Sequence, residues 1–186
     1  MKTFILMANN DEAKHLQDLE IENNNVGIII TGEGRSNAIK EIARCIRYGI
    51  IGKDDRVINV GYVGSKGYDK GSIVTVGCVE HLIPSKTIKE SCFALNCVEG
   101  FEVAGCFTAD NFVGQDDVNP WMPEKFVCDM ELYYLALIFP GIMSIKIVSD
   151  SLDYDEYTNA NFEESWATVR NKLKEIVWSG LQQIYT

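Results

Sequence analysis

The sequence predicts an α/β fold, a three-layer α/β/α sandwich around a central mixed, mostly parallel sheet. Short apolar runs, several of them rich in β-branched residues, alternate along the chain with longer stretches of helical spacing. The apolar runs are nearly continuous, which is typical of strands covered on both faces. The length of 186 residues, with 46% apolar and 24% charged residues, fits a single domain over residues 1–186.

The first part of the chain is expected to supply three strands and two helices. Residues 3–8 are apolar and are followed at once by polar residues, which indicates a buried strand that ends there. Residues 11–20 carry apolar side chains at three-residue spacing and predict a helix. Residues 26–31 form a β-branched strand, and residues 36–46 again show helical spacing. Residues 56–60 predict a third strand that ends in a glycine-containing turn.

The second part continues the alternation and ends on a long helix. Residues 72–76 and 102–108 predict the fourth and fifth strands. Residues 125–139 begin as a strand end and become a helix through Glu131. Residues 144–149 are the sixth strand. Residues 161–185 place their apolar side chains on one helical face and predict the last helix.

Composition excludes several classes of protein. With 17 basic and 27 acidic residues the formal charge is 17 − 27 = −10, which disfavours binding to nucleic acid. The most apolar run, 133–139, is far shorter than the roughly 20 residues that a membrane-spanning helix needs. The first eight residues lack the apolar length of a signal peptide. Six cysteines without a CxxC pair, and only two histidines, argue against a zinc site and favour a reduced, cytoplasmic protein.

A ligand site is expected where the strands end. In α/β sheets ligands bind at the carboxyl ends of the strands. The segments directly after strands are residues 9–12, 32–35, 61–65, 110–113 and 150–153. We therefore expect these segments to meet around one pocket.

Two of the segments are rich in glycine, and each has two interpretations. Residues 31–37, Thr-Gly-Glu-Gly-Arg-Ser-Asn, can expose backbone N–H groups to an anion, with Arg35 as a candidate anion contact. The segment matches neither GxGxxG nor a Walker loop, so a plain strand-to-helix turn is the alternative. Residues 59–65, with Gly61 and Gly64, allow a ligand to approach the backbone or simply form a turn.

Three carboxylates are candidates for acid–base or sugar-binding roles. Asp150 directly follows a buried strand, where loss of water contact raises the pKa of a carboxyl and keeps a proton ready for donation. Glu131 stands at the start of an apolar helix and Glu12 close behind the first strand. For these two the structural alternative is that they complement a helix dipole, and for Asp150 that it caps a turn.

In their order along the chain, these segments resemble the nucleoside phosphorylase/nucleosidase superfamily, nearest to methylthioadenosine/S-adenosylhomocysteine nucleosidase. Residues 31–38 resemble the family's SGIGKxNA, and residues 57–64 resemble IINTGSAG. Residues 108–113 resemble SGDxFI, residues 129–131 resemble EME, and residues 148–153 resemble ISDxAD. Each motif is short, and the order of the motifs gives the resemblance its weight.

The resemblance implies the phosphorylase/hydrolase-like fold and a role for each matching residue. Asp150 would protonate purine N7, and Glu12 would orient and deprotonate the attacking water. Glu131 would bind the ribose hydroxyls beside Met130. The remaining substrate-binding residues implied are Phe112, which would stack on the base, Val113, whose backbone would bind the base edge, Gly61, Tyr62, Ser149 and Lys146. The resemblance implies no metal or organic cofactor, and it implies a homo-oligomer, often a dimer.

Three activities remain open on this resemblance. Hydrolysis of the N-ribosidic bond of a purine nucleoside or thionucleoside is the first, because Asn59 stands where the related phosphorylases carry an arginine. A phosphate-dependent phosphorylase is the second, with Arg35 and Lys146 as its anion contacts. A non-catalytic nucleoside-binding protein is the third, because Tyr62 replaces the family's water-holding serine and the chain is shortened.

Overall fold

The computed structural model describes residues 1–82 and 92–182. The strands are β1 Thr3–Met7, β2 Val26–Ile30, β3 Arg56–Lys66, β4 Ile73–His81, β5 Phe93–Ala94, β6 Glu102–Thr108, β7 Phe126–Asp129 and β8 Met143–Asp150. The helices are α1 Asn10–Ala13, α2 Gln17–Glu22, α3 Arg35–Arg47, α4 Leu132–Ile138, α5 Tyr154–Thr158 and α6 Glu163–Gln182, with a 3-10 turn at Gln115–Asp117. No helix among the described residues is long and apolar enough to cross a membrane.

The strands form one mixed sheet, part of which closes on itself. β2, β1 and β3 pair in parallel in that order. β3 then pairs with β7, β7 with β6, β6 with β4, β4 with β8, and β8 returns to β3, so these five strands form a closed ring. The α/β class and the mixed sheet are confirmed, but the three-layer sandwich does not describe the ring. Register shifts in β3 and β4 bend these strands, and bending of this kind allows a sheet to close.

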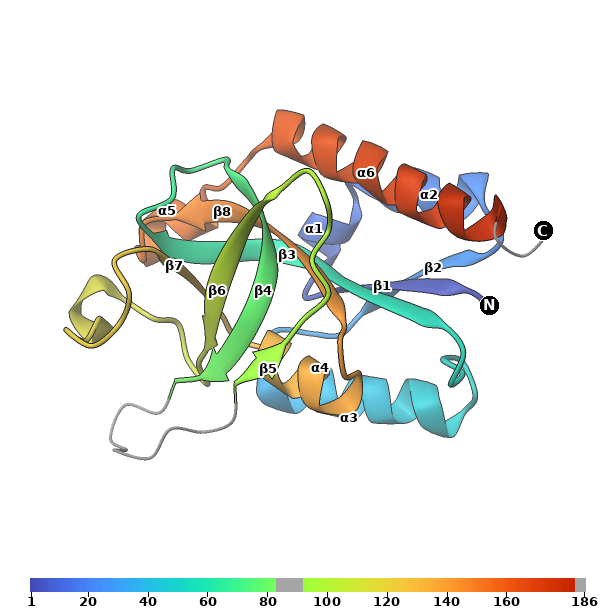
Figure 1. Cartoon of the computed structure of the whole chain (residues 1–186), viewed down its shortest axis with the longest axis horizontal. Helices are drawn as coiled ribbons and strands as arrows, with labels where there is room; N and C mark the ends of the chain where they lie inside the picture. The colour runs from blue at the N-terminus through green and yellow to red at the C-terminus, as the bar shows by residue number, and fades with distance from the viewer. Residues whose placement is uncertain (83–91, 183–186) are drawn as a thin grey trace.

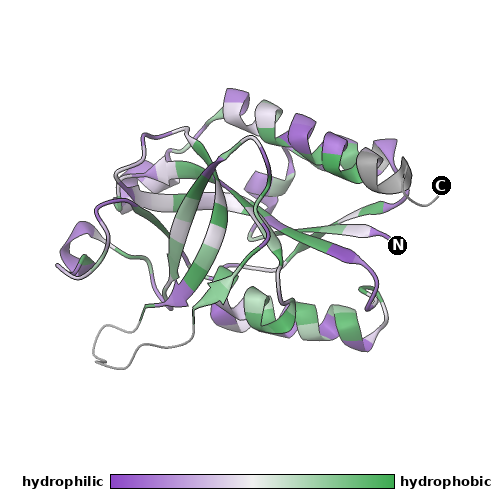
Figure 2. Ribbon diagram, viewed as in Figure 1, coloured by the Kyte–Doolittle hydropathy of each residue, from purple (hydrophilic) through white to green (hydrophobic). Residues whose placement is uncertain are grey.

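Helices cover both sides of the β2–β1–β3 part of the sheet (Figure 1). On one side α6 and α2 pack on β1 and β3, and Trp166 of α6 is the largest fully buried side chain there. On the other side α3 and α4 pack on the same strands and on β4 and β6. Hydrophobic residues concentrate on the strands and on the helix faces turned toward them (Figure 2), as expected if burial of apolar surface stabilises the fold.

Most expected elements are present, and two differ in a way that bears on the site. The helix expected over residues 11–20 is broken into α1 and α2, and His15, between them, stacks on Trp166 at 4.9 Å. The strand expected over residues 56–60 continues through both glycines to Lys66. Its extension pairs with β7 and β8, so the expected turn at residues 61–65 is strand instead.

The end of one further strand was also misjudged. β4 runs to His81, five residues beyond the expected end at Val76. The last helix is present as α6, described to Gln182, and the rest of the expected helix lies outside the described residues. Cys45, Cys106 and Cys128 are buried free thiols, whereas Cys92 and Cys97 are exposed.

Candidate active site

A cavity of about 250 Å³ lies where β1, β7 and β8 end, beside residues 62–64 within β3. Five carboxyl groups line it, and they belong to Glu12, Glu33, Asp129, Glu131 and Asp150. Its aromatic lining residues are Tyr62, Phe112, Tyr154 and Tyr157. The described lining residues include no Lys, Arg or His. The cavity therefore presents aromatic rings and acidic groups to a ligand.

Glu12 is held on α1 directly behind β1. The side chain of Asn9 caps this helix by accepting a hydrogen bond of 3.0 Å from the Glu12 N–H. The Glu12 carboxyl is buried and accepts hydrogen bonds from the N–H groups of Tyr62 at 2.8 Å and Ala8 at 3.1 Å. Burial raises the pKa of Glu12, while these N–H groups and the charge of Lys146 oppose the rise. The carboxyl is thus fixed in place and more basic than usual.

Gly61 supports Glu12 rather than lining the cavity. A Cβ at Gly61 would lie 2.9 Å from Oε1 of Glu12, so only glycine leaves room for this carboxyl beside β3. Gly64 stands in the same relation to Asp150, because a Cβ there would lie 2.8 Å from Oδ1. Both glycines therefore accommodate carboxyl groups, and Gly64, unlike Gly61, also lines the cavity.

Asp150 ends β8 and is fully buried. Its Oδ1 accepts a hydrogen bond from the Asp153 N–H at 3.2 Å, and its Oδ2 lies 2.6 Å from the Ser149 hydroxyl. Burial raises the pKa of Asp150, and the hydrogen bonds from Ser149 and the backbone oppose the rise.

The Ser149 hydroxyl holds Asp150 in place from inside the protein. Its oxygen lies within hydrogen-bond distance of two acceptors, Oδ2 of Asp150 and the Val63 carbonyl at 3.0 Å, and its single hydrogen can go to either. Ser149 is buried and is not among the described residues that line the cavity, so it contacts Asp150 and not the cavity where the sequence predicted a ligand contact.

Glu131 is the residue that precedes α4. The residue is 8% exposed, and its Oε1 accepts a hydrogen bond of 2.5 Å from the Gly34 N–H. Burial and the neighbouring Asp129 raise the pKa of Glu131 to about 7, while Lys146 and the Gly34 N–H oppose the rise. Glu131 can therefore exchange a proton near neutral pH.

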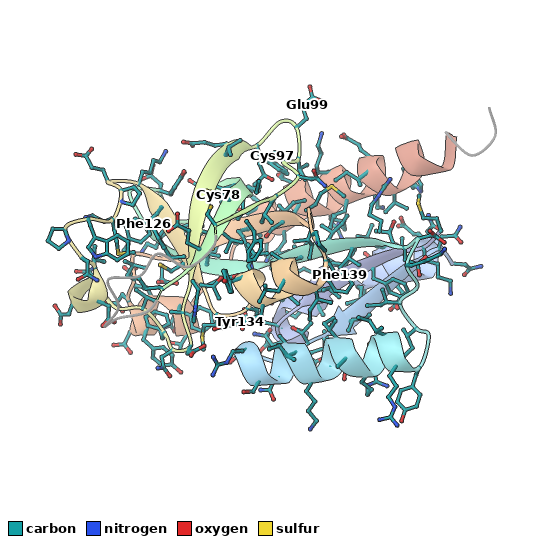
Figure 3. The ribbon with its side chains drawn as sticks, turned by 60° about the horizontal axis from the view of Figure 1, so that its bottom comes forward. Cys78, Cys97, Glu99, Phe126, Tyr134 and Phe139 are labelled. Carbon is teal, nitrogen blue, oxygen red and sulfur yellow. The ribbon has the colours of Figure 1, made fainter. Side chains whose placement is uncertain are left out.

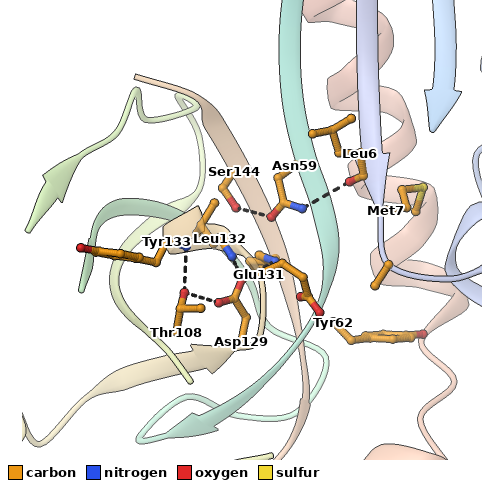
Figure 4. A network of polar contacts seen from close by, with 12 residues as sticks. Leu6, Met7, Asn59, Tyr62, Thr108, Asp129, Glu131, Leu132, Tyr133 and Ser144 are labelled. Carbon is orange, nitrogen blue, oxygen red and sulfur yellow. Dashed lines mark hydrogen bonds and ion pairs between the residues drawn. The ribbon is translucent and has the colours of Figure 1, made fainter. Parts of the chain in front are cut away.

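A buried ion pair stands behind this wall. The Lys146 ammonium lies 3.0 Å from Oδ2 of Asp129, and both side chains are 3% exposed. Asp129 also accepts hydrogen bonds from the Thr108 hydroxyl at 2.6 Å (Figure 4) and from the Leu132 N–H at 3.1 Å. Burial opposes the charge of Lys146, but Asp129 and Glu131 hold its pKa above the ordinary value. Lys146 therefore anchors Asp129 inside the protein, and it is not among the described residues that line the cavity, where a substrate contact was expected.

The other expected residues divide between the cavity and its surroundings. Phe112, Val113 and Met130 line the cavity. Tyr62 lines the cavity, and its hydroxyl accepts a hydrogen bond from the Trp166 indole at 2.7 Å, so the tip of the side chain points toward α6. Its aromatic ring contacts Trp166 and Phe162.

Arg35, the expected anion contact, is engaged elsewhere. Its guanidinium lies 3.2 Å from the Asp110 carboxyl and 5.5 Å from the ring of Tyr134, which α4 places beside the start of α3 (Figure 3). Arg35 is not among the residues that line the cavity. The glycine-rich turn at residues 31–37 instead contributes the Gly34 N–H to Glu131.

Sequence reasoning missed Glu33, Tyr154 and Tyr157, all of which line the cavity. Glu33 lies between the two glycines of residues 31–37, a segment already selected as a possible ligand contact, so the sequence could have indicated it. The tyrosines belong to α5, a helix of five residues that was not expected. The sequence does hold a signal for the start of this helix, because Asp153 is a residue type that caps helices. Its side chain accepts hydrogen bonds from the N–H groups of Asp155 and Glu156.

Comparison with solved structures shows the same fold in nucleosidases. The futalosine hydrolase of Helicobacter pylori strain 26695 superposes with a TM-score of 0.74 at 15% identity, over 96% of this chain and 98% of that one. The 5'-methylthioadenosine/S-adenosylhomocysteine nucleosidase (MTAN) of Chlamydia trachomatis gives 0.75 at 16%, over 96% and 98%. The corresponding nucleosidase of Neisseria meningitidis, in complex with methylthio-immucillin-A, gives 0.71 at 19%, over 96% and 100%.

Comparisons at the level of sequence give no match. No family model matches the chain, and no curated protein matches it. The similarity to solved structures therefore establishes the fold, and arguments about activity depend on the site itself.

Proposed function

We propose that the protein hydrolyses the N-ribosidic bond of a purine nucleoside or thionucleoside and releases the free base. One observation carries the proposal: Glu12, Glu131 and Asp150 come from three different segments of the chain and line one cavity. All three are buried, and the pKa of each is raised. Cleavage of such a bond passes through a cationic, oxocarbenium-like sugar, which carboxyl groups on either side of it stabilise.

Each carboxyl takes a distinct part in this reaction. Asp150, hydrogen-bonded to Ser149, gives its proton to the purine N7 so that the base leaves neutral. Glu12, held by two backbone N–H groups, orients water and accepts its proton as the water attacks the anomeric carbon. Glu131 accepts hydrogen bonds from the ribose hydroxyls, and Phe112 stacks on the base.

The charge of the cavity favours water over phosphate as the nucleophile. A phosphorolytic site needs positive groups to bind phosphate. The cationic candidates, Arg35 and Lys146, are paired with Asp110 and Asp129, and the described lining of the cavity carries carboxyls in place of cations. Phosphate would meet like charge here, so phosphorolysis is the weaker alternative.

In this proposal, the presence of Tyr62 in place of the family's serine does not remove the groups that hold the attacking water. The Tyr62 N–H still binds Glu12, and its side chain is turned away toward Trp166. A binding protein without turnover therefore has no particular observation in its favour.

The proposal is tested by incubating the purified protein with a panel of purine nucleosides and 5'-thionucleosides in phosphate-free buffer. Release of free base, followed by chromatography, is the expected result. Purine binding without any release would support the non-catalytic alternative and would contradict the proposal.

A further inference from the structure

Glu33 is a carboxyl of the cavity that the proposed reaction does not use. It lies on the turn between β2 and α3, flanked by Gly32 and Gly34, which have φ of +80° and +81°. Its two hydrogen-bond donors are both uncharged, the Asn9 amide at 2.9 Å and the Tyr157 hydroxyl at 3.5 Å. The side chain is exposed, so a ligand can reach it.

Glu33 lies at the ribose end of the cavity. The next residue, Gly34, donates its N–H to Glu131, the proposed ribose-binding group. Burial raises the pKa of Tyr157, and the charges that raise it further are Glu33, Glu12 and Glu131. The charged neighbour of Asp150, at the base end, is instead Glu156. With the base on C1' and the 2'- and 3'-hydroxyls on Glu131, the group left to meet Glu33 and Tyr157 is the substituent at C5'.

Tyr157, which contacts Glu33, belongs to a cluster of aromatic rings on the cavity wall. Tyr157 lies 6.2 Å from both Phe112 and Tyr154, and Phe112 meets Tyr154 edge-on at 5.4 Å. All three rings line the cavity, and Tyr154 is 59% exposed. Aromatic faces attract cations, and a nearby carboxylate adds direct charge attraction. This combination suits a positive group better than a neutral or negative one.

We propose that Glu33, together with Tyr157, makes the site selective for nucleosides whose 5'-substituent carries a positive charge, a sulfonium or an ammonium group. The inference rests on the proposed function and adds the class of substrate. Glu33 acts as a specificity-determining residue that pairs with the cation, and the tyrosine ring contacts its alkyl groups. A 5'-phosphate would instead meet the carboxyls of the lining.

The test compares two adenosines that differ chiefly in charge, 5'-methylthioadenosine and its S-methyl sulfonium derivative. The ratio of kcat/KM for the sulfonium to that for the thioether is measured, together with the ratio of their dissociation constants by calorimetry. We expect both ratios to favour the sulfonium by about tenfold. In Glu33→Gln the ratios should fall toward one, because the amide has the shape of the carboxylate without its charge.

The matched control is Glu164→Gln, which removes one negative charge from an exposed glutamate on α6 that does not line the cavity. It should leave both ratios as in the wild type. Ratios near one in the wild type, or ratios that survive in Glu33→Gln, overturn the inference. If neither nucleoside is hydrolysed, the proposed function fails, but the binding ratio still decides whether the site selects positive charge.

Discussion

The buried carboxyl groups of Glu12 and Asp150 differ in their hydrogen-bond partners. Glu12 accepts two backbone N–H groups, a set of donors that suits an ionised carboxylate. Asp150 accepts one backbone N–H and lies beside the Ser149 hydroxyl, and burial raises its pKa. In the proposed reaction Glu12 is the base and Asp150 the acid, since groups with the same chemistry take opposite roles when their surroundings differ.

Asp150→Asn should lower kcat by about 10²–10⁴-fold, because the amide cannot give a proton to the leaving base. Base release is measured under saturating nucleoside, with thermal unfolding as a check that the fold is intact. Ser149→Ala should lower kcat by less, since it removes a positioning group and leaves the acid. An unchanged kcat in Asp150→Asn would remove Asp150 from the mechanism.

Glu131 should make the protein less stable as pH rises. Its pKa is raised from 4.5 to about 7 in the folded protein, so folding favours its protonated form. The stability that the proton provides is complete below 4.5 and is lost as pH rises through about 7. Urea unfolding of the wild type and Glu131→Gln over this range should show the wild type losing stability relative to the variant. A constant difference would mean that Glu131 has an ordinary pKa.

Residues on the cavity wall were partly predictable and those behind it were not. Glu12 and Asp150 stand directly after apolar runs, so the rule that ligands bind where strands end found them. Lys146 and Ser149 belong to the same strand as Asp150, but the sequence does not show which neighbours the closed sheet brings to their side chains. The position of the Lys146 side chain is set by its ion pair with Asp129, a contact that only the folded chain makes.

Among the strands and helices, β3 differs most from its predicted extent. Two glycines within five residues looked like a turn, whereas the strand runs on to Lys66. The physical reason is local: the missing side chains at Gly61 and Gly64 make room for Glu12 and Asp150. A glycine in a strand often marks such a close approach, and the sequence alone does not separate this case from a turn.

Gly61→Ala should displace Glu12, because its new methyl group would lie 2.9 Å from the carboxyl. A displacement of this kind costs about 10²-fold in kcat. The matched control is Gly105→Ala in β6, where the nearest atom to the new methyl group is Sγ of Cys78 at an ordinary 3.7 Å. Base release should be near normal in the control. Equal activity of the two variants would contradict the steric account.

The ion pair that links β7 to β8 gives a prediction about stability. Lys146→Met leaves Asp129 buried without its cation and should lower the free energy of unfolding by about 3–5 kcal/mol. Adding Asp129→Asn removes the unpaired charge and should restore much of the loss. Urea unfolding of the single and double variants measures both. A double variant no more stable than the single one would show that the charge is not the cause.

At the scale of the whole molecule, the α/β class could be predicted from the sequence, but the closure of five strands into a ring could not. The alternation of apolar runs and helical spacing predicted strands and helices in nearly the right order. Closure depends on the antiparallel pairing of β4 with β8 and of β3 with β7, contacts between distant parts of the chain. Closure matters for the site because it brings the ends of β7 and β8 to one cavity beside residues 62–64 of β3.

The central claim is that this cavity uses water to cleave an N-ribosidic bond. The most direct measurement follows base release from the best nucleoside of the panel with and without added phosphate, and identifies the sugar product. The account predicts equal rates in both buffers and free ribose or its 5'-derivative as the sugar product. Release that requires phosphate and yields a sugar 1-phosphate would contradict it.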